Sequence, residues 1–292
     1  MRNKSLLLIF TVLVFATLII LVCSAVFSVR NINIISEGKT ETETYTENQV
    51  REFLNGFKGK NIFTQKKEEI EEKLIARFPY MKVIGIEKKF PSILEIKITK
   101  RQEVFYTYPA YDGKYYILDT DLKVLRIEEA LPSNDNLIRI YFTGGNSTAK
   151  FENIALYDFL NAGNFGFTIT TPSFANESGY QYLTAAANAI ECLTLNGYED
   201  TKVISLMREI RFTVALNDGA YFSLQTRSGA YIRIHFRSGG IYEPENEQAL
   251  RKLYQKVMTG INIYNESEDK TSGKTITVDE NNVNNDIQVI VK

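Results

Sequence analysis

One uncharged apolar run, residues 6–27, limits what this chain can fold into more than any other feature. It reads LLLIFTVLVFATLIILVCSAVF and follows a short start that carries Arg2 and Lys4. A helix of about 22 residues, rising ~1.5 Å per residue, covers the ~30 Å hydrocarbon core of a bilayer. The run therefore predicts a single N-terminal transmembrane helix over 6–27, in contact with the lipid bilayer.

The charges before the run predict its direction. Arg2 and Lys4 precede it without an acid, which favours a cytoplasmic tail over 1–5 and a single-pass protein of the cell membrane. The alternative is a cleaved secretory signal, whose apolar region has roughly 7–15 residues. Because this run is longer and 24–26 is a poor cleavage site, we favour an uncleaved anchor. Both alternatives place the C-terminal part outside the cytoplasm.

Composition favours a folded domain beyond the run and excludes several classes of partner. The chain is 44% hydrophobic and 24% charged, so it can bury a core. A formal net charge of −1 gives no reason to expect nucleic acid. Cys23 lies inside the apolar run and Cys192 far from it, so no internal disulfide is expected.

Residues 27–100 carry the signals of five consecutive elements in the order β-α-α-β-β. Pro79 ends the second helix because its ring cannot continue the hydrogen-bonding pattern, and 90–92 reads as a turn. In the strand before that turn, we expect Ile84 and Ile86 on one face, with Val83 on the other. The predicted elements are a strand over 27–35, a helix opened by the Thr46-x-x-Gln49 capping box, a helix over 65–77, and strands over 81–88 and 93–98.

These residues resemble the bacterial cell division family FtsQ, called DivIB in Gram-positive bacteria, whose module after the anchor is a POTRA domain. The pattern departs from the family in 100–104, which keeps only an arginine and a valine, and at Leu122, where glycine is common. The resemblance covers roughly 1–140. The matching motifs are Gly59-Lys60-Asn61-Ile62-Phe63, Phe78-Pro79-Tyr80-Met81, the hairpin of 88–96 and a second hairpin over 115–125.

The resemblance implies a POTRA domain over 28–100 and a membrane-distal β domain over 101–292. It further implies a non-enzymatic scaffold at the division septum that bridges partners of the FtsB/DivIC and FtsL types and supports the septal peptidoglycan synthase. One alternative is an anchored POTRA-like ectodomain of another envelope assembly, such as sporulation or secretion. The other is an envelope enzyme without a recognisable motif.

Beyond residue 140 the pattern predicts a mixed α/β domain with a mostly antiparallel sheet, so the expected fold class is α+β. The stretch 144–180 has weak periodicity and reads as an insertion or as irregular strands. The remaining predicted elements are a helix over 182–196, a three-stranded meander over 211–237, a helix after Pro244 and a C-terminal strand pair over 274–292.

The last strand is the candidate binding site. In the resembling family, the strand after the last helix is an exposed edge to which the FtsB/DivIC partner adds a strand, and this role is carried over by position. An edge strand presents unpaired N–H and C=O groups. The alternative is a terminal strand that only completes the sheet. The candidate residues are Asp286, Ile287, Gln288, Val289, Ile290 and Val291.

Catalytic and metal motifs are absent from the sequence, which predicts no enzyme, no cofactor and no metal site. His235 is the one histidine, on a strand face with Tyr231, Arg233 and Arg237, and we interpret it as a polar residue of a half-buried sheet. That basic face could meet an anionic envelope polymer or lipid, but solvation is the simpler interpretation. Asp119 and Asp121 fit a hairpin turn, and Cys192 fits a helix core.

Overall fold

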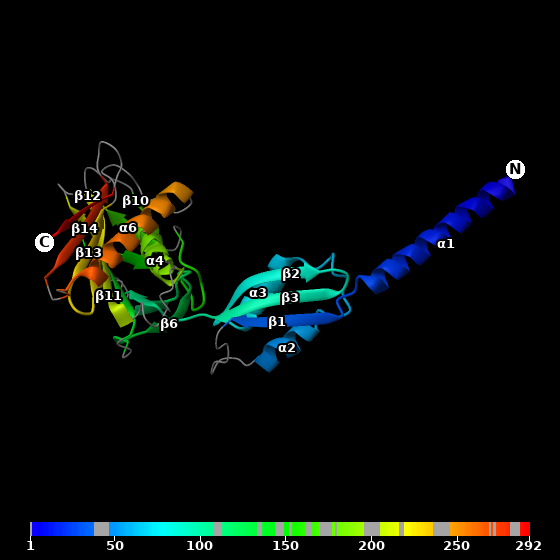
Figure 1. Cartoon of the computed structure of the whole chain (residues 1–292). Helices are drawn as coiled ribbons and strands as arrows, with labels where there is room; N and C mark the ends of the chain where they lie inside the picture. Colours follow the sequence, from blue (N-terminus) through cyan, green and yellow to red (C-terminus); the bar gives the residue numbers. More distant parts are fainter. Residues whose placement is uncertain are drawn as a thin grey trace. The chain divides into compact units, whose positions relative to one another are not determined.

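The protein was analysed as a computed structural model in which the chain divides into two compact units, Met1–Arg101 and Gln102–Lys292 (Figure 1). The structure describes residues 2–37, 47–107, 113–132, 136–143, 149–151, 154–161, 165–169, 177–178, 180–195, 205–215, 219–235, 246–268, 270, 273–280 and 287–292. Of the residues named in the predictions above, Thr46, Arg237, Pro244 and Asp286 lie outside these residues.

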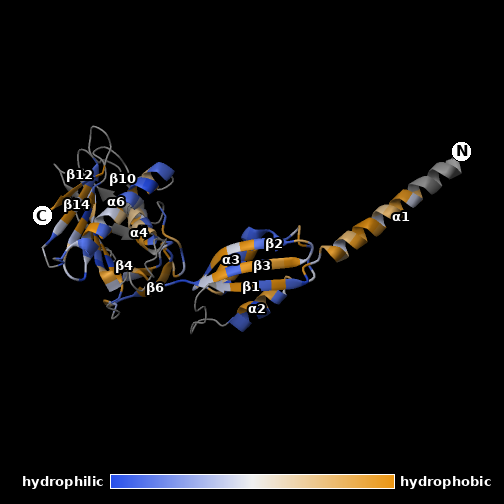
Figure 2. Cartoon of the chain, viewed as in Figure 1, coloured by the Kyte–Doolittle hydropathy of each residue, from blue (hydrophilic) through white to orange (hydrophobic). Residues whose placement is uncertain are grey.

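The first element, α1 (Arg2–Val26), corrects the fold-class prediction. Most of its described residues are apolar, as the colours of Figure 2 show, and the side chains of 10–26 are exposed. In the described part of the chain, however, no helix combines the length and apolar character that crossing a membrane needs, so the transmembrane helix predicted over 6–27 is wrong.

The rest of the N-terminal unit is a three-stranded sheet with two helices. Its strand order is β1-β3-β2, with β1 parallel to β3 and β2 antiparallel to it. The helices close the core with Val50 and Leu54 from one and Ile70 and Leu74 from the other, all almost fully buried. The elements are β1 (Asn31–Glu37), α2 (Glu47–Asn55), α3 (Lys67–Arg77), β2 (Met81–Lys89) and β3 (Ile93–Lys100).

A bulge in β2 overturns the predicted faces of that strand. Val83 pairs with Ile98 and Gly85 with Lys97, so Ile84 is an extra residue without a partner in the register. A β-bulge reverses the alternation of side chains beyond it. Ile84 is therefore 45% exposed while Ile86 is buried, and Val83 packs against the core.

The C-terminal unit is built on a mixed sheet with the order β15-β14-β13-β12-β11-β7-β4-β5-β6. Three neighbouring pairs are parallel, namely β14 with β13, β11 with β7, and β7 with β4. The strands are β4 (Phe105–Thr107), β5 (Tyr115–Leu118), β6 (Val124–Glu128), β7 (Ile138–Thr143), β11 (Met207–Ala215), β12 (Gly219–Thr226), β13 (Tyr231–His235), β14 (Thr275–Glu280) and β15 (Ile287–Val291).

Two helices, α4 (Tyr180–Leu195) and α6 (Glu247–Glu266), share one hydrophobic core with this sheet. α4 contributes an apolar stripe at helical spacing, and all of its residues are buried: Leu183, Ala187, Ile190 and Leu193. The side chain of Asn246 caps α6 by accepting the backbone N–H groups of Gln248 and Ala249. Within 144–180, a separate small sheet has the order β10-β9-β8 and consists of β8 (Ala149–Phe151), β9 (Phe165–Ile169) and β10 (Glu177–Ser178).

Candidate functional site

The last strand, β15, forms one edge of the nine-stranded sheet. It pairs antiparallel with β14, from Glu280 opposite Ile287 to Ile276 opposite Val291. Among the strands that the structure describes, β15 has no neighbour on its other side. Its residues are those of the predicted candidate site from Ile287 onward.

The hydrogen bonds of the ladder show which backbone groups of β15 face outward. Thr275 and Lys292 exchange both backbone hydrogen bonds at 2.9 Å. In an antiparallel pair, every second residue repeats that arrangement, and the residues between them point their N–H and C=O groups away. Ile290 and Gln288 therefore face β14. The residues whose backbone groups point away from β14 are Ile287, Val289 and Val291. Their three N–H donors and three C=O acceptors lie along the edge.

The side chains of β15 divide between core and solvent. Ile287 and Val289 pack against the core of the unit, whereas Ile290 and Val291 are 51% and 50% exposed. Apolar side chains at an exposed edge strand are unusual, because natural proteins commonly protect such edges with charge, proline or a covering segment. The edge thus combines open backbone groups with apolar side chains.

A buried ion cluster fixes the strand on which β15 rests. The Glu280 carboxylate at the end of β14 lies 2.8 Å from Lys256 Nζ and 3.2 Å from Lys252 Nζ, both from α6, and Lys256 also donates to the carbonyl of His235 on β13. Burial acts to raise the pKa of Glu280, but the hydrogen bonds and charges of the two lysines outweigh it and hold the pKa below its usual value. The cluster ties α6, β13 and β14 together beside the edge.

The opposite edge of the sheet, at β6, is covered. Val124 donates to the carbonyl of Asp158 and Tyr157 donates to the carbonyl of Val124, both at 2.8 Å. A β-bridge joins Lys123 to Phe159 just before β6 begins. The segment that contains 157–159 therefore occupies part of the edge at β6, whereas no strand that the structure describes pairs with the outer side of β15.

On β13, the side chains of His235 and Arg233 both contact the ring of Tyr221 on β12. The imidazole stacks on the Tyr221 ring at 5.0 Å, and Arg233 lies over the same ring at 5.5 Å. His235 Nδ1 is 3.9 Å from a carboxylate oxygen of Asp279. Within the described residues no three metal-ligating side chains gather.

The other candidate residues have local structural roles. Asp119 is buried, and its Oδ1 accepts the backbone N–H groups of Asp121 at 2.9 Å and Lys123 at 2.8 Å, which organises the turn between β5 and β6. Cys192 is buried in α4, and its Sγ contacts the carbonyl of Tyr254 at 3.8 Å.

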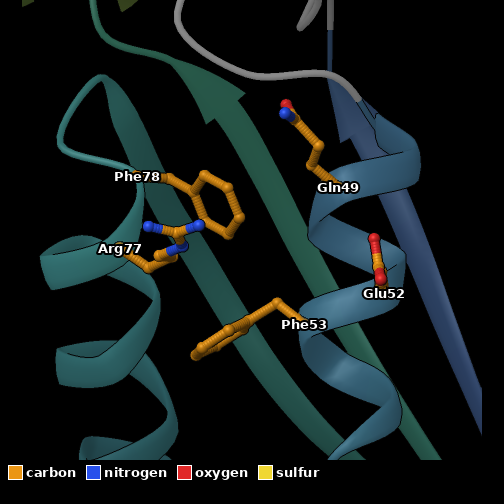
Figure 3. Close-up of a pocket in the computed structure, with 5 residues that line it drawn as sticks. All are labelled: Gln49, Glu52, Phe53, Arg77 and Phe78. Atoms are coloured by element: carbon orange, nitrogen blue, oxygen red, sulfur yellow. The ribbon is translucent and has the colours of Figure 1, made fainter.

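A pocket in the N-terminal unit was not predicted. It has a volume of about 400 Å³ and lies between α2 and α3, where Phe53 and Phe78 meet edge to face at 5.8 Å and Glu52 and Arg77 flank them (Figure 3). Such a depression depends on how two helices pack, so the residues of one helix alone do not reveal it.

Comparison with known proteins identifies the N-terminal unit. The family model described as POTRA domain, FtsQ-type, matches residues 27–101, and these residues contain the β-α-α-β-β order described above. The resemblance to the FtsQ/DivIB family is thereby confirmed. No curated protein matches the chain.

Proposed function

We propose that this chain, a division-related POTRA protein by its FtsQ-type domain over 27–101, is a non-enzymatic scaffold of the bacterial division machinery. The observation that carries the proposal is the combination of that domain with an open strand edge at β15. The scaffold would act at the division septum through domains outside the cytoplasm. It would support septal peptidoglycan synthesis by holding its partners together.

Strand addition is the binding mode that the edge supports. An extended segment laid against β15 would pair with the outward N–H and C=O groups of Ile287, Val289 and Val291. Main-chain hydrogen bonds supply affinity in this mode, and side-chain contacts supply specificity. The exposed side chains of Ile290 and Val291 offer the apolar part of such contacts.

The proposed occupant is a segment of an FtsB/DivIC-type protein, with an FtsL-type protein bound to the same complex and the septal peptidoglycan synthase further along the assembly. Association with FtsB/DivIC is what the family resemblance implies. The structure adds a reason for the position, because the covered edge at β6 leaves less room for a strand than β15 does.

A single proline at residue 289 tests the proposal. Val289→Pro removes an outward N–H, and proline is tolerated at edge positions whose N–H faces solvent, so the ladder with β14 should survive. The full chain carrying Val289→Pro should bind the purified FtsB/DivIC–FtsL pair at least about tenfold more weakly, the equivalent of about 1.4 kcal/mol. Denaturant unfolding should show that the fold is retained.

Val289→Thr is the matched control, since threonine keeps both the N–H and the β-branched shape. It should bind as the original chain does. Equal binding by the proline and threonine variants would refute strand addition at β15 while leaving a division role open. No binding of the pair by the unsubstituted chain would refute the division scaffold itself and favour another envelope assembly.

A further inference from the structure

Three phenylalanine rings cluster at one end of the POTRA domain, and two of them, Phe63 and Phe90, are stacked and exposed. The ring of Phe63 lies 5.0 Å from Phe27 and 4.9 Å from Phe90, measured between centroids. Phe63 is 58% exposed and Phe90 is 55% exposed. Exposed apolar side chains that gather in one place commonly mark an interaction site. We call Phe27, Phe63 and Phe90 the aromatic tip.

Backbone hydrogen bonds hold the aromatic tip in place. Ile62 donates to the carbonyl of Phe27 and Val29 donates to the carbonyl of Lys60, both at 2.8 Å, which joins the start of the domain to the loop after α2. Arg30 donates to the carbonyl of Ser92, also at 2.8 Å, which adds the β2–β3 turn. The three rings therefore come from three segments that are hydrogen-bonded to one another, so the aromatic tip is preformed.

The charge around the aromatic tip has one sign. The segments that supply it, 27–30, 58–65 and 88–92, contain Arg30, Lys58, Lys60, Lys88 and Lys89 but no Asp or Glu. Arg30, Lys58, Lys60 and Lys89 are exposed. Lys89 forms an ion pair with Glu95 of β3. Exposed aromatic rings surrounded by lysine and arginine are the combination that binds an anionic lipid surface, where rings enter the interface and cations meet headgroups.

We propose that the aromatic tip binds the surface of an anionic lipid membrane, with Phe63 and Phe90 entering the interface and the surrounding bases contacting headgroup phosphates. The apolar surface continues along the chain, because Phe27 directly follows Val26, the end of α1, whose described side chains are exposed. This is contact with a surface and requires no segment to cross the bilayer. It would set the distance of the POTRA domain from the lipid.

Tryptophan fluorescence can test the contact directly, because the chain has no tryptophan. In full-length Phe63→Trp, the single indole reports the environment of the tip. With vesicles of phosphatidylglycerol and phosphatidylcholine, we expect its emission to shift to shorter wavelength and to be quenched by lipids brominated on the acyl chains. Tyr141→Trp, at a 38% exposed tyrosine of the C-terminal unit, is the control and should show neither change.

Charge reversal on the Phe63→Trp background distinguishes the contribution of the basic residues to vesicle binding from that of the rings. Lys60→Glu should weaken vesicle binding severalfold, whereas Arg77→Glu, at the far end of α3 from the loop that carries Lys60, should not. Added salt should reduce binding because it screens exposed charges. Circular dichroism should confirm that each variant is folded.

The proposal predicts a response that is specific to anionic vesicles. An unchanged indole emission of the Phe63→Trp variant with anionic vesicles would overturn it, and so would an equal response to phosphatidylcholine alone. A blue shift that occurs without vesicles and grows with protein concentration would also overturn it, in favour of a second copy of the chain as the occupant.

Discussion

Gly260 of α6 lies against Ile232 of β13 so closely that a Cβ atom on the glycine would be 2.4 Å from Cγ2 of the isoleucine. The same Cβ would be 3.3 Å from Cγ2 of Val278 on β14. Both neighbours are β-branched, so neither side chain can rotate away easily. The absence of a side chain at Gly260 is therefore what lets α6 rest on the two strands that precede the candidate binding edge.

Gly260→Ala should destabilise the C-terminal unit by about 1–3 kcal/mol, because overpacking outweighs the gain in helix propensity. Urea unfolding of the full chain measures the change. Adding Ile232→Ala should make the effect of Gly260→Ala smaller, since it removes the clashing methyl group. If Gly260→Ala costs the same in both backgrounds, the clash is not its cause.

The bulge in β2 predicts opposite outcomes at two similar residues. Ile86→Ala should cost about 2–5 kcal/mol because it empties a buried site, whereas Ile84→Ala should cost less than about 1 kcal/mol. Chemical unfolding followed by a probe in the N-terminal unit compares them. Equal large losses would show that both side chains face the core and that the bulge is absent.

The ion cluster of Glu280 predicts a dependence of stability on pH. Because the folded-state pKa lies below the unfolded value, the carboxylate stabilises the fold above the ordinary glutamate pKa, and this contribution is lost as pH falls through the folded-state value. Glu280→Gln should therefore lower the free energy of unfolding by about 3 kcal/mol at pH 7, because it leaves the charge of Lys256, only 5% exposed, without its partner. The difference in free energy of unfolding between this variant and the original chain should narrow below pH ~4.

The control for this prediction is the exposed pair of Glu247 and Arg251, whose side chains are 86% and 78% exposed. Glu247→Gln should change the free energy of unfolding by less than about 1 kcal/mol at either pH. If the free energy of unfolding differs between Glu280→Gln and the original chain by the same amount from pH 7 to pH 3, the ionisation of Glu280 does not contribute to stability as predicted.

Leu122 combines a buried side chain with a left-handed backbone, at φ 61°. Leu122→Ala should cost about 2–4 kcal/mol because it leaves a cavity and keeps the unfavourable φ. Leu122→Gly leaves a larger space but relieves about 1 kcal/mol of backbone strain, so it should be no less stable than the alanine variant. A glycine variant clearly less stable than the alanine variant would show that the backbone here is not strained.

Local signals carried the prediction of the POTRA domain. Pro79 and the turn at 90–92 mark element ends by the chemistry of single residues, and the buried Val50 and Leu54 follow helical spacing. The bulge at Ile84 gave no such signal, because the order of apolar residues along β2 does not show which one will be left without a partner. Only pairing with β3 decided which side chains of β2 face the core.

The sequence by itself determined the order of helices and strands in the N-terminal unit and the apolar character of its first helix, because both depend on neighbouring residues. Tertiary structure decided the rest. It set the parallel pairing of β13 with β14 across α6 and the position of β15 at the edge of the sheet. These features depend on contacts between distant segments, where burial and hydrogen-bond pairing, not local pattern, select one arrangement.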